Sequence, residues 1–219
     1  MLMTIEEKLE FLSECETGYV TDALNLLGIQ NCWIENVLPL KSRKAIVGQA
    51  FTAQLIRIRG DEKCYTLYEV AEECPANRIL VYSGTEGYAL LGENISTNMC
   101  NKGIKAVVLD GKCRDIDGIT ELTMPVFCQG ATTRLTPKDL QITKIDVPIF
   151  IGGAKVNSGD IVVGDSDGVV IIPLERLDDV LKQIEWVAKV EHEAAEALKN
   201  KVSIEEFKKI IAKKKKPCV

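Results

Sequence analysis

The clearest indication of the fold class comes from residues 92–127, GENISTNMCNKGIKAVVLDGKCRDIDGITELTMPVF. A glycine opens a predicted helix over 91–102, and the continuous apolar run AVVL at 106–109 then predicts a strand. A charged loop over 110–117, a short helix and a further strand over 125–128 follow. Continuous apolar strands that alternate with helices are typical of a sheet covered on both faces, so this stretch predicts an α/β fold.

The flanking segments extend the same organisation. Before the central stretch, apolar residues at helical or alternating spacing predict elements at 5–13, 19–27, 46–59, 65–72 and 78–82. After it, glycine turns between apolar runs over Thr143–Pro173 predict a β-meander or small barrel. A long amphipathic helix is expected over Leu174–Leu198, with a short one after Ser203. We expect one domain over residues 1–219, a layered α/β sandwich with a mixed sheet and a long C-terminal helix.

The charge and hydropathy of the chain exclude several classes of partner. A formal net charge of -5 argues against nucleic acid, because phosphate neutralisation needs a surplus of Lys and Arg on one face. The basic run Lys213–Lys216 is the exception, and we interpret it as a solvated tail. Residues 1–14 lack the apolar region of a signal peptide, and no stretch approaches the roughly 18 apolar residues of a membrane span. These features predict a cytoplasmic protein that binds neither nucleic acid nor membrane.

The cysteine and histidine content restricts the available chemistry. Eight cysteines without a CxxC pair indicate reduced thiols, rather than a disulfide framework or a structural zinc site. Cys113 stands beside Arg114, which could activate the thiol, but a packed small residue is the favoured interpretation. The single histidine, His192, lies far away in a helical segment, which removes most His-based acid–base schemes. Carboxylates, an arginine and a metal must then carry any catalysis.

Two loops carry residues suited to a binding site. The segment Gly92–Ile95 stands at a helix start, where free backbone N–H groups and the helix dipole favour an anionic ligand such as a carboxylate. The segment Asp110–Asp115 directly follows the AVVL strand, and loops beyond the carboxyl ends of strands are a usual place for ligands in α/β sheets. Taken alone, each loop also fits an ordinary solvated connection.

The joint pattern of the two loops is more specific. Glu93 is followed after twenty residues by Arg114-Asp115, in a context that extends from TGYVTDAL at Thr17 to GDIVVGDSDGVVIIP at Pro173. This pattern resembles the aldolases for 4-hydroxy-4-methyl-2-oxoglutarate and 4-carboxy-4-hydroxy-2-oxoadipate, together with their relatives, the RraA-like regulators of ribonuclease activity. The resemblance implies the swivelling-domain topology of that family.

The resemblance also implies catalytic and metal-binding roles. Asp115 matches the aspartate that binds a divalent metal, Mg²⁺ or Mn²⁺. Arg114 matches the catalytic arginine that contacts the oxygens of a bound 2-oxo acid. Glu93 matches the acidic position that holds water on the metal. A hard cation with oxygen ligands and several waters suits one or two carboxylates, so the chemistry of these residues agrees with the implied roles.

The helix start is implied to receive the substrate carboxylate, through Gly92, Asn94 and Ile95. Two positions depart from the family pattern, because Glu93 stands where the aldolases generally have Asp, and Asn94-Ile95 replaces two small apolar residues. The additional methylene of Glu93 moves its carboxylate by more than about 1 Å, which matters for positioning water. The departures therefore bear on the identity of the substrate rather than on the metal.

The activity implied is that of a metal-dependent lyase. It would cleave a small 4-hydroxy-2-oxo acid, or decarboxylate oxaloacetate, and release pyruvate through an enolate. The alternative is a non-catalytic, RraA-like regulator that binds a ribonuclease. Retention of Glu93, Arg114 and Asp115 together favours the enzyme. A methyltransferase is disfavoured, because no glycine-rich nucleotide loop follows a first strand.

The resemblance further implies a homotrimer or homohexamer with sites at subunit interfaces. Family members place an acidic residue from a neighbouring subunit's C-terminal helix near the site. The candidates in this chain are Glu191, Glu193 and Glu196, and no motif selects among them. A solvated helix face is the alternative interpretation of each.

Overall fold

The computed structural model describes residues 3–41 and 45–214, and its centre is a mixed sheet. The strand order is β1 (Trp33–Ile34), β13 (Val169–Ile172), β12 (Ile161–Gly164), β3 (Ile46–Arg57), β4 (Ile79–Ser83), β6 (Ala106–Leu109), β8 (Val126–Cys128) and β2 (Leu38–Pro39). A further strand, β9 (Leu140–Ile145), also pairs with β3. β3, β4, β6 and β8 are mutually parallel, and the remaining pairs are antiparallel. The predicted α/β class and mixed sheet are therefore confirmed.

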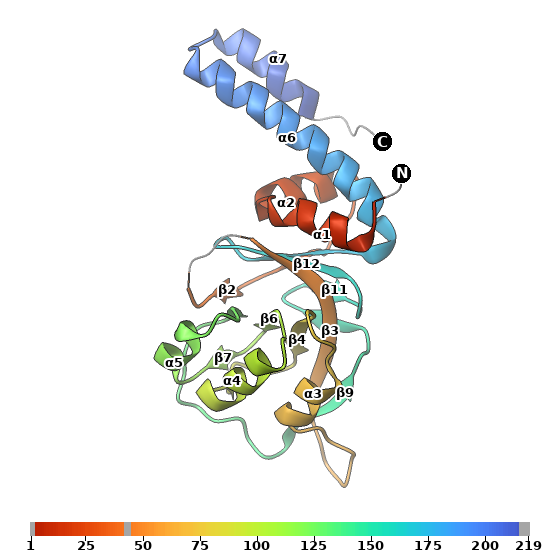
Figure 1. Cartoon of the computed structure of the whole chain (residues 1–219), viewed down its shortest axis with the longest axis vertical. Helices are drawn as coiled ribbons and strands as arrows, with labels where there is room; N and C mark the ends of the chain where they lie inside the picture. Colours follow the sequence, from red (N-terminus) through yellow and green to blue (C-terminus); the bar gives the residue numbers. More distant parts are fainter. Residues whose placement is uncertain (1–2, 42–44, 215–219) are drawn as a thin grey trace.

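The long strand β3 joins the two halves of this sheet. Its first residues pair with β12, its middle residues with β4, and its last residues with β9. The register shifts between Gln54 and Leu55, where an irregularity of this kind bends a strand. The sheet consequently curls, as the long arc of β3 shows (Figure 1).

Helices cover the two ends of the curled sheet (Figure 1). α3 (Leu67–Glu73), α4 (Glu93–Asn101) and α5 (Ile116–Glu121) pack on one face of the parallel strands. α1 (Ile5–Ser13), α2 (Thr17–Leu26) and the first half of α6 (Leu177–Lys199) pack on β12 and β13. A hairpin of β10 (Ile149–Ile151) and β11 (Ala154–Val156) closes the core on the opposite face of β4 and β6. This arrangement is the predicted layered sandwich.

The C-terminal segment forms a helical hairpin. α6 continues past the body of the molecule, and α7 (Ile204–Lys214) folds back along it (Figure 1). Small and apolar side chains hold the two helices together, among them Ala194, Ala197 and Ile210. The predicted long helix is present, preceded by a single 3₁₀ turn over Leu174–Arg176.

The basic run at the end of the chain differs from its predicted form. Lys213 and Lys214 belong to α7 and are not part of a frayed tail. Lys213 pairs with Glu193 at 2.5 Å, and Lys214 pairs with both Glu191 and Asp22. Carboxylates that precede the run by twenty or more residues therefore pair with Lys213 and Lys214, which a local charge count misses. Residues 215 and 216 lie outside the described residues.

Two other local predictions were wrong in detail. The segment 143–173 is not a meander of its own, because β12 and β13 extend the main sheet beside β3 and only β10 and β11 form a separate hairpin. The loop 110–117 contains a short strand, β7 (Lys112–Cys113), and the start of α5. Short strands take their partners from distant segments, and alternation alone does not identify those partners.

No helix in the described part of the chain is long and apolar enough to cross a membrane.

Candidate active site

A short parallel pair of strands brings the two predicted loops together. β5 (Ala89–Leu91) pairs with β7, and the backbone N–H of Arg114 donates to the carbonyl of Leu91 at 2.9 Å. The residues that follow each strand, Gly92 and Arg114, therefore lie side by side. Two segments separated by twenty residues in the sequence thus form one site.

Asp115 occupies a special backbone position. Its φ of 56° and ψ of 44° are left-handed, a region that asparagine and aspartate tolerate better than most residues. It caps α5, and its Oδ2 accepts from the N–H of Glu93 at 3.3 Å. The Nε of Arg114 lies 3.6 Å from the same oxygen. Both side chains are about half exposed, at 52% for Arg114 and 48% for Asp115, so they are accessible to a ligand.

Gly92 permits the close approach of these groups. A Cβ at this position would stand 2.6 Å from Oδ2 of Asp115 and 3.2 Å from Nε of Arg114, which is too close for a side chain. Gly92 also caps α4 without a side-chain hydrogen bond. The first N–H groups of a helix have no intrahelical acceptor, so the start of α4 offers donors and a positive dipole end to an anion.

Glu93 lies on the other side of the helix start. A Cβ on Gly118 would stand 2.5 Å from Oε2 of Glu93, so the carboxylate rests directly over the backbone of α5. The N–H of Glu93 reaches Asp115, and its side chain lies against Gly118 of α5. Glu93 is thus near the Arg–Asp pair but does not line the main cleft.

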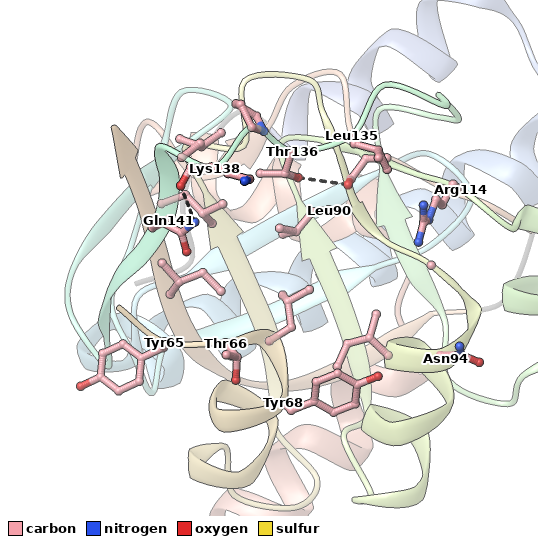
Figure 2. Close-up of a pocket in the computed structure, with 18 of the residues that line it drawn as sticks. Tyr65, Thr66, Tyr68, Leu90, Asn94, Arg114, Leu135, Thr136, Lys138 and Gln141 are labelled. Carbon is pink, nitrogen blue, oxygen red and sulfur yellow. Dashed lines mark hydrogen bonds between the residues drawn. The ribbon is translucent and has the colours of Figure 1, made fainter. Parts of the chain in front are cut away.

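The main cleft has a volume of about 580 Å³. Five of the six predicted site residues line it, namely Gly92, Asn94, Ile95, Arg114 and Asp115, and Glu93 does not. Arg114 and Asn94 stand at one end, and Tyr65 and Gln141 stand at the opposite end (Figure 2). A second hollow of about 520 Å³ is also lined by Arg114 and Asp115, together with residues 131–133.

Sequence reasoning missed the far walls of the cleft. They comprise the start of α3 and the segment that leads into β9, with Tyr65, Thr66, Tyr68, Leu135, Thr136, Lys138 and Gln141. The bridge between Ala89 and Leu135 and the pairing of β9 with β3 bring these segments to the site. No motif marks them, and the only local signal is the Thr66–Glu69 capping box that starts α3.

Asp110 supports the site without facing it. Its carboxylate accepts from the N–H groups of Gly84 and Thr85 at 2.9 Å each, and from the Thr85 hydroxyl at 2.8 Å. Gly111 lies so close to Thr85 that a Cβ there would stand 2.1 Å from its Oγ1. These contacts fix the loop that leads into β7, so the first residue of the predicted loop is structural.

Cys113 is a packed thiol, as the sequence indicates. Its side chain is fully buried in the core beside α4 and α5. Contact with Cys128 and burial both raise the pKa of Cys113. A buried thiol that stays protonated is a poor nucleophile.

The donor set at Asp115 fits a hard, largely hydrated cation. Within residues 3–41 and 45–214, no group of three or more His, Cys, Asp or Glu side chains could enclose a metal. Mg²⁺ usually keeps several waters and takes one or two carboxylates, whereas zinc sites need about three or four protein ligands. The half-exposed carboxylate of Asp115 meets the first requirement.

The three C-terminal glutamates are occupied within their own hairpin. Glu191 pairs with Lys214, Glu193 with Lys213, and Glu196 with Lys199. The contribution of one of them to a neighbouring subunit's site stays a prediction.

The fold is an α/β sheet whose open helix start lies beside an Arg–Asp pair, an arrangement that suits a small anionic ligand. More specifically, the chain belongs to the RraA-like family: the family model described as Aldolase/RraA matches residues 17–171.

The relatives include a protein named as an aldolase and a protein described as a member of the RraA family. A protein of Halalkalibacterium halodurans named putative 4-hydroxy-4-methyl-2-oxoglutarate aldolase is 31% identical, over 81% of this chain and 83% of that protein. The structure of Streptomyces coelicolor RraAS2, described as an unusual member of the RNase ES inhibitor RraA protein family, superposes with a TM-score of 0.75 at 25% identity, covering 91% and 98% of the two chains. An uncharacterised protein from Pseudomonas syringae pv. tomato shares the fold at a TM-score of 0.84 and 23% identity, over 94% and 95%.

Proposed function

We propose that this protein is a divalent-metal-dependent lyase that releases pyruvate from a 4-hydroxy-2-oxo acid or from oxaloacetate. The observation that carries the proposal is the convergence at Gly92, where the open start of α4, the guanidinium of Arg114 and the carboxylate of Asp115 meet. The similarity to a putative 4-hydroxy-4-methyl-2-oxoglutarate aldolase supports the same reaction.

The helix start and Arg114 bind the 2-oxo acid end of the substrate. The N–H groups at the beginning of α4 receive the carboxylate, because they lack intrahelical acceptors. Arg114 reaches the same region and contacts the oxygen on which negative charge develops during the reaction. A donor already in place at that oxygen lowers the barrier without reorganisation.

Asp115 would hold the metal, with water filling the remaining positions. When bound, a divalent cation supplies Lewis-acid chemistry, since it withdraws electrons from the 2-oxo group. The left-handed backbone of Asp115 and its bond from the Glu93 N–H fix the direction of its carboxylate. Asp115 would therefore orient the metal, and Arg114 neutralises the negative charge that develops on the substrate oxygen.

Glu93 accepts the proton of the substrate's 4-hydroxyl through a water molecule. In the aldol cleavage, the 4-hydroxyl proton passes to a water molecule held by the Glu93 carboxylate, and the C3–C4 bond breaks. The bonding pair forms the pyruvate enolate, whose oxygen faces Arg114, and a proton then returns to C3. In oxaloacetate, carbon dioxide leaves in place of the carbonyl fragment, so the same residues serve both reactions.

We further propose a cytoplasmic homotrimer or homohexamer that binds neither nucleic acid nor membrane. The seven cysteines in the described ranges are all free thiols, which suits a reducing compartment. The projecting hairpin carries the exposed apolar residues Leu198 and Ile204, which suit contact with another subunit. Light scattering on purified protein tests the assembly.

The alternative is an RraA-like regulator that binds a ribonuclease, supported by the similarity to RraAS2. The two functions make opposite predictions for one assay. Pyruvate release is followed from oxaloacetate and from 4-hydroxy-4-methyl-2-oxoglutarate, with Mg²⁺ or Mn²⁺ and then with excess chelator. The lyase releases pyruvate and stops with chelator. Folded protein that releases none from either compound favours the regulator.

A further inference from the structure

The middle of the cleft, between the end marked by Arg114 and the end marked by Tyr65 and Gln141, has walls that suit an apolar group (Figure 2). Tyr68 of α3 and Leu135 of the segment before β9 lie on opposite sides of it, with Leu90 between them (Figure 2). Tyr68 is 51% exposed and Leu135 is 59% exposed, so both side chains present apolar surface to a ligand. Single exposed apolar residues are ordinary, but two that face one another across a cleft indicate a binding surface.

Two of the three charged side chains among the described residues that line the cleft stand together at the end marked by Arg114 (Figure 2). Arg114 and Asp115 are adjacent, and the only further charged side chain among the described lining residues is Lys138, at the exposed rim. The 2-oxo acid head therefore has one polar end to bind, and whatever is attached beyond C4 must run along Leu90. The volume of about 580 Å³ is within the range for ligands much larger than pyruvate.

We infer that the substrate carries an apolar, ring-sized group on C4, and that Tyr68, Leu90 and Leu135 bind this group. The inference rests on the proposed lyase function and specifies its substrate class. It distinguishes this protein from a lyase whose 4-hydroxy-2-oxo acid carries a carboxylate attached to C4, which would need cationic groups where Leu90 and Leu135 stand. The walls raise the rate by fixing the C3–C4 bond against Arg114.

The probe is 4-hydroxy-2-oxo-4-phenylbutanoate. Its cleavage breaks C3–C4, transfers the hydroxyl proton to water and yields benzaldehyde, while the enolate takes up one proton to give pyruvate. Oxaloacetate serves as the reference, because it occupies only the polar end. The measured quantity is the ratio of kcat/KM for the phenyl compound to that for oxaloacetate, with Mn²⁺ present.

Three variants test the apolar walls. Leu135→Ala and Tyr68→Ala each lower this ratio about tenfold, the effect of removing a side chain from an apolar pocket. Phe150→Ala is the matched control, since Phe150 is 72% exposed on β10 and lies outside the cleft lining. It leaves the ratio unchanged. Circular dichroism and light scattering verify that all three variants keep the fold and the assembly.

The possible outcomes distinguish a failure of the apolar subsite from a failure of the proposed lyase function. If oxaloacetate is turned over but Leu135→Ala and Tyr68→Ala leave the ratio of kcat/KM values unchanged, the apolar subsite is overturned and the lyase function stands. Faster cleavage of 4-hydroxy-4-methyl-2-oxoglutarate than of the phenyl compound, with a loss in Lys138→Gln, overturns the apolar subsite in favour of an acidic substrate. If Leu135→Ala dissociates the assembly, the surface contacts a neighbouring copy of the chain, and the apolar subsite is again overturned. No pyruvate from any compound overturns both proposals.

Discussion

The carboxylate of Glu93 rests on the backbone of Gly118, where a Cβ would stand 2.4 Å from the Glu93 Cδ and 2.5 Å from Oε2. The contact places the first residue of α4 over the middle of α5. It also gives a means of moving Glu93 without altering it. The side chain is flexible, so an added methyl group displaces the carboxylate rather than the helix.

Gly118→Ala should lower pyruvate release by about tenfold to a hundredfold, because the water held by Glu93 is misplaced. Stability should stay the same or rise by up to about 1 kcal/mol, since alanine favours the helix. The matched control is Gly18→Ala in α2, where nothing lies within 4 Å of the added Cβ. Steady-state kinetics and urea unfolding measure both effects. Full activity in Gly118→Ala would remove Glu93 from the mechanism.

Gly92→Ala should damage binding of the metal and of substrate together. The Cβ would stand 2.6 Å from Oδ2 of Asp115, so this carboxylate must leave its position beside the start of α4. We expect about a hundredfold loss of turnover and weaker Mn²⁺ binding by isothermal titration calorimetry. Wild-type affinity for Mn²⁺ in this variant would argue that Asp115 is not the ligand.

Tyr82→Phe should leave stability unchanged or raise it by about 1 kcal/mol. The side chain is fully buried in β4, and its hydroxyl has no hydrogen-bond partner among the described residues. Burial raises the pKa of Tyr82, with a smaller contribution from Cys74, so the group stays neutral. The free energy of unfolding in urea measures the change. A clear loss of stability would reveal a buried water that bonds to the hydroxyl.

Thiol labelling should distinguish two groups of cysteines. Cys64 and Cys100 are part exposed, and the other five described cysteines are buried. Burial raises the pKa of Cys74 to about 12, so its reactive thiolate forms only at a pH far above 8. Mass spectrometry after brief alkylation at pH 8 should find the label on Cys64 and Cys100 and not on Cys74. Rapid labelling of Cys74 in the native protein would contradict this packing.

The fold class could be predicted because short apolar runs such as AVVL at 106–109 alternate with helical segments, a pattern typical of a sheet covered on both faces. Strand partners were harder to predict. β12 and β13 are four residues each; β12 pairs with β3 across more than a hundred positions of the sequence, and β13 pairs with β12 and β1. Alternation indicates a strand and leaves its neighbours unspecified.

The residues of the candidate site were likewise predictable only in part. The loops that carry Gly92, Arg114 and Asp115 could be predicted locally, as a helix start and a loop after a strand, but the roles of Arg114 and Asp115 came from the resemblance to the family. The structure brings these three together. The orientation of Glu93 over Gly118 could not be predicted, since it depends on how α5 packs against α4. Nor could Tyr68 and Leu135, whose segments are held at the cleft by the bridges of Tyr65 with Ile142 and of Ala89 with Leu135.

The most direct test of the central claim is oxaloacetate decarboxylation by Asp115→Ala at saturating Mn²⁺, beside the wild type. Asp115 is half exposed and its side chain makes no capping bond to α5, so the fold and the assembly should persist without its hydrogen bond from the Glu93 N–H. We predict that pyruvate release falls to the background rate of free Mn²⁺ and no longer responds to chelator beyond that background. Metal-stimulated release at the wild-type rate in the folded variant would contradict the account.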